Sequence, residues 1–178
     1  FVLPQVGPAL THFTDIATDD DHIYIAGHSS LGNDAYLAKI DRASLTVETQ
    51  KLCSITDGQG FRIGGIHLDG NYLYAAGYYS DTSGTTKQLG IVLKCNKEDL
   101  SVADSVCFYS GTSARPITFK DVVTDSSYVY AIGHSEAEGG NYNKGLIVRL
   151  SKTDLSLSTA RVYSYSTDVI EFAAGQIS

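Results

Sequence analysis

The sequence lacks long apolar runs, an excess of basic residues and any methionine. No apolar run approaches the roughly 18 residues that a transmembrane helix needs, so we expect no membrane span. The 13 Lys and Arg side chains are outnumbered by 20 Asp and Glu, which argues against a nucleic-acid partner because phosphate binding needs a basic face. A translated chain starts with Met and this one starts with Phe1, so we expect a processed product or a fragment.

Signatures of catalysis and of metal binding are also missing. The five histidines form no His-x₃-His pair and no Cys-x-x-Cys pair is present, so we expect no zinc site. The segment from Gly27 to Leu31 resembles a nucleophile elbow, but Leu31 stands where that motif requires a second glycine. No glycine-rich phosphate loop precedes a helix. The sequence therefore predicts no catalytic residue, no metal, no cofactor and no enzyme activity.

The composition that is present fits one folded domain, residues 1–178. Hydrophobic residues make up 43% of the chain and charged residues 19%, so the chain can bury a core. Ser and Thr together number 34, with 17 Gly and 12 Tyr, a bias that suits β-strands and turns and disfavours long helices. This bias is typical of extracellular β-proteins, and we expect an extracellular or cell-surface location.

Three cysteines are an odd number, so at least one thiol has no partner within the chain. Free cysteines usually pack as small buried hydrophobes, which is the interpretation we favour; an intermolecular disulfide is the alternative. Cys53 and Cys107 fall at equivalent points of a predicted fourth strand, and Cys95 lies in a third strand. Since Cys95 and Cys107 are not expected to face each other, a bridge between them is disfavoured.

The chain contains a threefold internal repeat. Three segments share the pattern Asp-x₄-Tyr-x₂-Gly, with landmarks Asp19, Tyr24 and Gly27; Asp69, Tyr74 and Gly77; and Asp125, Tyr130 and Gly133. A basic residue and a leucine recur at a spacing of 55 residues: Lys39, Lys94 and Arg149, and Leu45, Leu100 and Leu155. The run Asp19–Asp21 could suggest calcium, but its equivalents in the other units are ordinary turn residues.

Each repeat predicts four short antiparallel strands joined by tight turns. The predicted strands are 13–18, 22–28, 35–40 and 45–54; 62–68, 72–79, 90–95 and 100–109; and 118–124, 128–134, 145–150 and 155–165. The third strand of each unit is apolar on both sides apart from its basic residue, so it should be covered on both faces. Stacked propeller blades at about 13–61, 62–117 and 118–168 provide that cover. An ordinary β-sandwich is the alternative.

The repeat pattern resembles the seven-bladed β-propeller repeat family. The landmarks above carry the resemblance, together with Tyr109-Ser110-Gly111 and Tyr163-Ser164-Tyr165-Ser166. Such repeats occur in large bacterial and archaeal surface or secreted proteins, and the resemblance implies a scaffold or binding module. Family propellers contain many more blades, whereas only three are complete in this sequence.

The ends of the predicted blade array should be open. Three blades cannot close a ring, because propellers have about four to eight. Residues 169–178 look like the first strand of a fourth unit. Open apolar β edges invite pairing with another chain, so we expect a homo-oligomer or polymer in which neighbouring subunits complete one another through these edges.

The repeated basic residues Lys39, Lys94 and Arg149 need partners, because each sits in an apolar strand. We expect them to meet a repeated carboxylate, with Asp15 or Asp121 as the candidate type. Gly65 stands at that place in the second unit, so Lys94 must find another partner.

Loop variation gives the one hint of a ligand face. The loops between strands two and three, at 29–34, 80–89 and 135–144, vary in length and lie on the same side as the links 54–61 and 110–117. Variable loops on a rigid scaffold often carry binding residues, although tolerated insertions explain them equally well. The aromatic contacts of such a face would be His28, Tyr78, Tyr79, His134 and Tyr142.

Three functions are compatible with these observations. The first is a non-enzymatic extracellular scaffold or self-assembling structural protein whose open ends are completed by neighbouring subunits. The alternative is an adhesin that binds a glycan or protein through the variable-loop face. A fragment of a propeller enzyme comes last, because no nucleophile, base or metal set is present.

Overall fold

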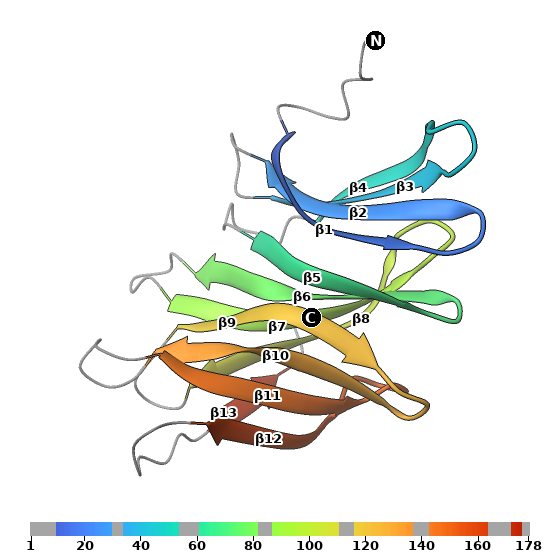
Figure 1. Cartoon of the computed structure of the whole chain (residues 1–178). Helices are drawn as coiled ribbons and strands as arrows, with labels where there is room; N and C mark the ends of the chain where they lie inside the picture. The colour runs from blue at the N-terminus through green and yellow to red at the C-terminus, as the bar shows by residue number, and fades with distance from the viewer. Residues whose placement is uncertain are drawn as a thin grey trace.

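The protein folds into three antiparallel β-sheets stacked face to face (Figure 1). The computed structural model describes residues 10–29, 34–53, 61–81, 87–110, 116–136, 143–163 and 172–175. No helix occurs among these residues, and none is therefore long and apolar enough to cross a membrane. The predicted fold class, repeated four-stranded antiparallel blades in an all-β protein, is confirmed.

Each blade contains four strands in sequence order. Blade 1 consists of β1 (Leu10–Thr18), β2 (His22–Ser29), β3 (Ala35–Asp41) and β4 (Val47–Cys53). Blade 2 consists of β5 (Phe61–Asp69), β6 (Tyr72–Asp81), β7 (Lys87–Asn96) and β8 (Val102–Ser110). Blade 3 consists of β9 (Ile117–Thr124), β10 (Tyr128–Glu136), β11 (Asn143–Ser151) and β12 (Leu157–Tyr163).

The C-terminal strand β13 (Phe172–Gly175) joins blade 2 as a fifth strand. It pairs antiparallel with β8, from Phe172 opposite Ser110 to Gly175 opposite Cys107. The expectation that residues 169–178 begin a fourth blade is therefore wrong for their described part. An outer strand such as β8 has an unpaired row of backbone groups, and β13 pairs with the part of that row at residues 107–110.

A β-bulge interrupts the pairing of the first two strands at the same point in every blade. The extra residue is Thr14, Gly64 or Lys120. At the bulge the first strand lies against the repeated glycine of the second strand. A Cβ atom added at Gly27, Gly77 or Gly133 would lie 2.4, 1.9 or 2.0 Å from a backbone carbonyl oxygen of that first strand. The repeated glycine is thus a steric requirement of the bulge.

The turn between strands three and four places its repeated leucine in the left-handed backbone region. Leu45, Leu100 and Leu155 have φ of 57°, 57° and 49°. Each leucine amide donates a hydrogen bond to the carbonyl four residues earlier, as from Leu100 to Asn96 at 2.9 Å. The side chains of Leu100 and Leu155 are buried against the preceding blade, which offsets the cost of this conformation.

Two hydrophobic cores hold the stack together, one at each boundary between blades. The first combines blade 1 with blade 2 and includes Tyr24, Leu37 and Phe61. The second combines blade 2 with blade 3, where Phe108 and Phe119 meet edge to face with ring centroids 5.3 Å apart. Blade 2 is buried on both faces, as the apolar third strand predicted.

All three cysteines are free thiols, and Cys95 and Cys107 are buried. Their predicted packing as small hydrophobes is confirmed, and burial raises the pKa of both thiols to about 12. Cys95 and Cys107 do not face each other across β7 and β8. The predicted alignment of the fourth strands is wrong by one residue, because Phe108, not Cys107, is the equivalent of Cys53 and Tyr163.

Candidate functional site

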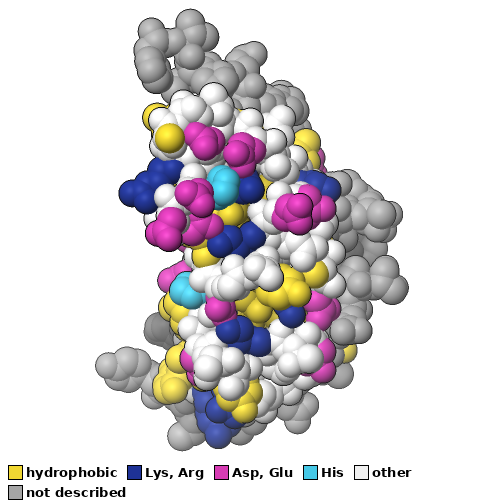
Figure 2. Space-filling view, turned by 90° about the vertical axis from the view of Figure 1, so that its right-hand side faces the viewer, with side chains coloured by type: hydrophobic (Ala, Val, Ile, Leu, Met, Phe, Trp, Pro, Cys, Tyr) yellow, Lys and Arg dark blue, Asp and Glu magenta, His cyan; other side chains and the backbone are white. Residues whose placement is uncertain are grey.

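The two ends of each blade differ in what they carry. The tight turns joining strands one and two, and strands three and four, gather at one end of the stack (Figure 1). Acidic, basic and histidine side chains collect on this end, which faces the viewer in Figure 2. We call it the turn end. The opposite end carries the variable loops, most of which lie outside the described residues.

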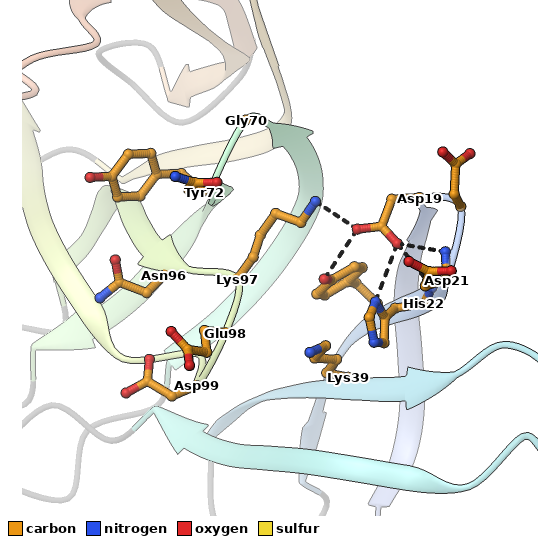
Figure 3. Close-up of a pocket in the computed structure, with 13 residues that line it drawn as sticks. Asp19, Asp21, His22, Lys39, Gly70, Tyr72, Asn96, Lys97, Glu98 and Asp99 are labelled. Carbon is orange, nitrogen blue, oxygen red and sulfur yellow. Dashed lines mark hydrogen bonds and ion pairs between the residues drawn. The ribbon is translucent and has the colours of Figure 1, made fainter.

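A polar cleft of about 850 Å³ opens at the turn end, between blade 1 and blade 2 (Figure 3). Blade 1 contributes the β1–β2 turn together with Tyr24 and Lys39. Blade 2 contributes its two turns, at residues 70–72 and 96–99. We call this the first-boundary cleft, and it is the candidate functional site.

Asp19 is the best-organised side chain in the cleft. Its Oδ1 accepts hydrogen bonds from the backbone amides of His22 at 2.9 Å and Asp21 at 3.2 Å. Its Oδ2 accepts the hydroxyl of Tyr24 at 3.3 Å. In blade 3, Asp125 and Tyr130 form the same bond at 2.7 Å. In blades 1 and 3, the Asp and Tyr of the Asp-x₄-Tyr pattern therefore link the turn between strands one and two to the second strand by a side-chain hydrogen bond.

Lys97 reaches across from blade 2 to Asp19. Its Nζ lies 2.6 Å from Asp19 Oδ2 and 5.6 Å from the centroid of the Tyr24 ring (Figure 3). Burial raises the pKa of Asp19, but the hydrogen bonds from Lys97 and from the two turn amides outweigh it. The pKa of this carboxyl is consequently held well below its ordinary value.

Lys39, on β3, turns toward its own blade. Its Nζ lies 3.3 Å from Glu48 Oε2, and His22 Nε2 lies 3.2 Å from the same oxygen. Glu48 occupies the bulge of β4 opposite Lys39. The carboxylate thus draws the ammonium group away from blade 2 and leaves the cleft open.

The equivalent space between blade 2 and blade 3 is smaller, about 290 Å³. Lys94 fills it, since its Nζ donates to the carbonyl oxygens of Lys152 at 2.7 Å and Thr153 at 3.3 Å. The same Nζ lies 4.4 Å from the centroid of the Tyr72 ring. Ala103 stands where blade 1 has Glu48, and Asp104, the residue opposite Lys94, forms no ion pair with it among the described residues. The larger cleft is thus at the boundary where the cation of the third strand pairs within its own blade.

The structure gives the repeated cations other partners than the predicted carboxylates. Lys39 meets Glu48, and the Arg149 guanidinium donates to Ser158 Oγ at 3.1 Å while lying 4.5 Å from the Tyr128 ring. The two predicted acceptors serve backbone amides instead: Asp15 accepts from Ile16 and Ile66, and Asp121 accepts from Val122. Asp15 and Asp121, on the first strands of their blades, thus accept hydrogen bonds from backbone amides next to the bulge. The bond from the Ile66 amide to Asp15 also links β1 to β5.

The predicted ligand-face residues are spread over the loop end of the three blades. His28, Tyr78 and His134 are equivalent residues, each following the repeated glycine of a second strand. Tyr79 packs against the first core, and Tyr142 lies outside the described residues. The structure does not bring these residues together in one pocket that it describes.

His28 stacks on His12 with ring centroids 4.9 Å apart. Burial lowers the pKa of His28, and the nearby charges of Arg62 and His12 lower it further. This aromatic pair lies at the opposite end of blade 1 from the first-boundary cleft.

The first-boundary cleft offers groups of both charge signs to one volume. Carboxylates, two ammonium groups, an imidazole and tyrosine rings line it, a set suited to hydrogen bonding with polar groups. Among the described residues no group of three or more His, Cys, Asp or Glu is placed to hold a metal ion. The side chains that line the cleft suit recognition by hydrogen bonds and charge.

Sequence reasoning missed the ion pair that crosses between blades. Its cation is the second residue of the turn between strands three and four, and it recurs at the repeat spacing as Arg42, Lys97 and Lys152. The equal spacing could have identified this position. It did not, because the turn residues were interpreted only as turn formers.

Fold and cleft together define a protein of repeated β-sheet blades, with an arrangement consistent with a propeller-like fold. No protein-family model matches the chain, and no curated protein sequence is significantly similar to it.

Replacing Lys97 with methionine is expected to destabilise the protein by about 1 kcal/mol or less at neutral pH, as for other partly exposed ion pairs. The folded-state pKa of Asp19 is depressed, so its contribution is present above its unfolded pKa and is lost as the pH falls. The difference between wild type and variant should therefore shrink below about pH 4. Urea unfolding at a series of pH values measures it, with Lys120→Met, on an exposed lysine of β9, as the control. Identical pH profiles for both variants would contradict a role for the ion pair.

Proposed function

We propose that the chain is a non-enzymatic structural repeat protein of the cell surface or exterior, which assembles with further copies of itself through the two open faces of its blade stack. The observation that carries this proposal is a difference in burial between equivalent positions. Residues that pack between blades inside the stack are repeated on its two outer faces, where the described part of the chain leaves them exposed.

The outer face of blade 1 repeats the surface that blades 2 and 3 bury. Phe13 is 64% exposed, whereas its equivalents Ile63 and Phe119 are 1% and 0% exposed. Three further apolar residues of this face share the exposure: Ile16, Leu45 and Leu52. Contiguous apolar surface of this kind is typical of interaction sites.

The outer face of blade 3 repeats the opposite surface, the one that blades 1 and 2 bury. Tyr163 is 61% exposed, whereas its equivalent Phe108 is fully buried. Ile132 and Ile147 are likewise exposed on this face. The outer face of blade 1 and the outer face of blade 3 thus correspond to the two sheet faces that pack against each other at both blade boundaries.

The two ends of the blade stack are sheet faces. The sequence predicted open strand edges there, but the blades pack face to face, so each end of the stack presents one face of a sheet. A contact between the blade 1 face of one copy and the blade 3 face of another is heterologous. Such contacts close into a ring or extend into a filament, depending on the rotation between copies.

The test is the mass of the assembly as a function of concentration. Light scattering of the wild type should give masses that rise above the 19.1 kDa of one chain, and negative-stain microscopy should show rings or filaments. Ile16→Glu, on the open face of blade 1, should abolish the increase. Val102→Glu, at an exposed apolar residue of blade 2, serves as the matched control. A wild type that stays monomeric at every concentration, or equal behaviour of both variants, would refute the proposal.

A further inference from the structure

An ion pair recurs across both described blade boundaries. Lys97 of blade 2 pairs with Asp19 of blade 1, with Nζ 2.6 Å from Oδ2. Lys152 of blade 3 pairs in the same way with Asp69 of blade 2. In both cases the cation comes from the turn between strands three and four, and the carboxylate comes from the turn between strands one and two of the preceding blade.

Each outer face carries one unmatched half of this pair. Arg42 is the blade 1 equivalent of Lys97, and Asp125 is the blade 3 equivalent of Asp19. Neither forms an ion pair within the described residues. The cation is thus on one open face and the carboxylate is on the other.

Both halves already have the local geometry of the internal pairs. Lys152 donates to the carbonyl of Asp125 in its own blade, and Arg42 likewise donates to the carbonyl of Asp19, at 3.4 Å. The Asp125 carboxylate accepts the Tyr130 hydroxyl at 2.7 Å, as Asp19 accepts that of Tyr24. Arg42 therefore lacks only the partner from a preceding blade, and Asp125 lacks only the cation from a following one.

We infer that a second copy of this chain docks head to tail, so that Asp125 of one copy pairs with Arg42 of the next and sets the register of the two faces. This inference rests on the proposed self-assembly and specifies its contact. It continues an interface that the molecule already uses twice, with complementary charge at the matching positions.

A neighbouring cation fits the same arrangement. Lys94 crosses from blade 2 to two turn carbonyls of blade 3, and its equivalent Arg149 lies on the outer face of blade 3. In the docked pair, Arg149 of one copy faces the carbonyl oxygens of the turn that contains Arg42 in the next. The apolar faces supply the affinity, and these polar contacts select one register, because rim charges act mainly through specificity.

Charge reversal on either face tests the inference. Arg42→Glu and Asp125→Lys should each weaken self-association about tenfold or more, because each places like charges together between identical copies. An equimolar mixture of the two variants should restore assembly, since the new glutamate at position 42 then faces the new lysine at position 125. Arg42→Lys should assemble like the wild type, because the internal boundaries use lysine at this position.

A matched control separates register from general charge effects. Lys120→Glu makes the same charge change as Arg42→Glu at an exposed residue away from the Arg42 and Asp125 positions, and it should assemble normally. Asp125→Lys also removes the acceptor for the amides of Ser127 and Tyr128, so its fold is checked by circular dichroism. If it fails to fold, Asp125→Asn replaces it: that variant keeps an acceptor oxygen, loses the charge and should still weaken assembly.

The outcomes distinguish the inference from the proposed function. Loss in the single variants and recovery in the mixture, measured by sedimentation velocity, support the Arg42–Asp125 register. Wild-type assembly that is unaffected by Arg42→Glu, or a mixture no better than its components, overturns the register and leaves self-assembly standing. A wild type that never associates overturns both.

Discussion

Gly77→Ala should destabilise the protein by about 3 kcal/mol, near the upper limit for overpacking in a closely packed interior. The added Cβ would lie 1.9 Å from the carbonyl oxygen of Arg62 and 2.9 Å from the Cα of Ile63. Both obstacles are backbone atoms of β5, so a side-chain rotation cannot relieve the clash. The first strand of the central blade would have to shift, and β5 packs against both neighbouring blades.

Gly145→Ala is the matched control for this substitution. Gly145 also lies in a strand, β11, but a Cβ there would meet its nearest neighbours at 3.7 Å, an ordinary contact distance. Its free energy of unfolding should stay the same or rise slightly, because alanine restricts the unfolded chain more than glycine does. Urea denaturation of both variants gives the comparison. A loss for Gly77→Ala no larger than that for Gly145→Ala would show that the bulge tolerates a side chain.

Glycine substitutions at two equivalent leucines should have opposite effects on stability. Leu100 and Leu45 both have φ of 57°, but Leu100 is 1% exposed and Leu45 is 58% exposed. Leu100→Gly removes a buried side chain at a cost of about 2 to 5 kcal/mol, and relief of the left-handed conformation returns only about 1 kcal/mol. Leu45→Gly gains the same relief and loses little packing, so it should stabilise the monomer by about 1 kcal/mol.

Thermal or urea unfolding at low protein concentration measures both effects on the monomer. The same Leu45→Gly variant should weaken assembly at high concentration, because it removes apolar surface from the open face of blade 1. A destabilised Leu45→Gly monomer would mean that this side chain is packed in the free chain, which would contradict the exposed face.

The fold could be predicted from the sequence because the repeat supplied the same signal three times. Asp19, Tyr24 and Gly27 with their equivalents marked one hairpin, and the 55-residue spacing of Leu45, Leu100 and Leu155 marked the other. Both hairpins depend on local contacts within a few residues of each other. The pairing of the fourth strand with the third could not be predicted in this way, because a bulge at Glu48, Ala103 or Ser158 adds one residue that no turn signal indicates.

The candidate site was less predictable, because it depends on contacts between blades. The sequence paired Lys39 with Asp15 on the expectation that a buried cation meets a repeated carboxylate. In the structure Asp15 serves the amide of Ile66 in the next blade, and Lys39 meets Glu48, a residue that the other repeats lack. Repeat patterns describe what the blades share, whereas Lys39 pairs with Glu48 at a position where the blades differ.

The pairing of β13 with β8 affects how cooperatively the stack unfolds. In a simple repeat array each unit contacts only its neighbours, so stability is a sum of repeat and nearest-neighbour terms and end units can fray on their own. Here the chain leaves blade 2, forms blade 3 and returns to blade 2 through β13. Blade 3 is thereby enclosed in a loop whose two ends are both anchored on blade 2. Blade 3 can separate fully from blade 2 only after β13 has left β8. Blades 2 and 3 are therefore coupled into one unfolding unit, and blade 1 is the part that can unfold independently.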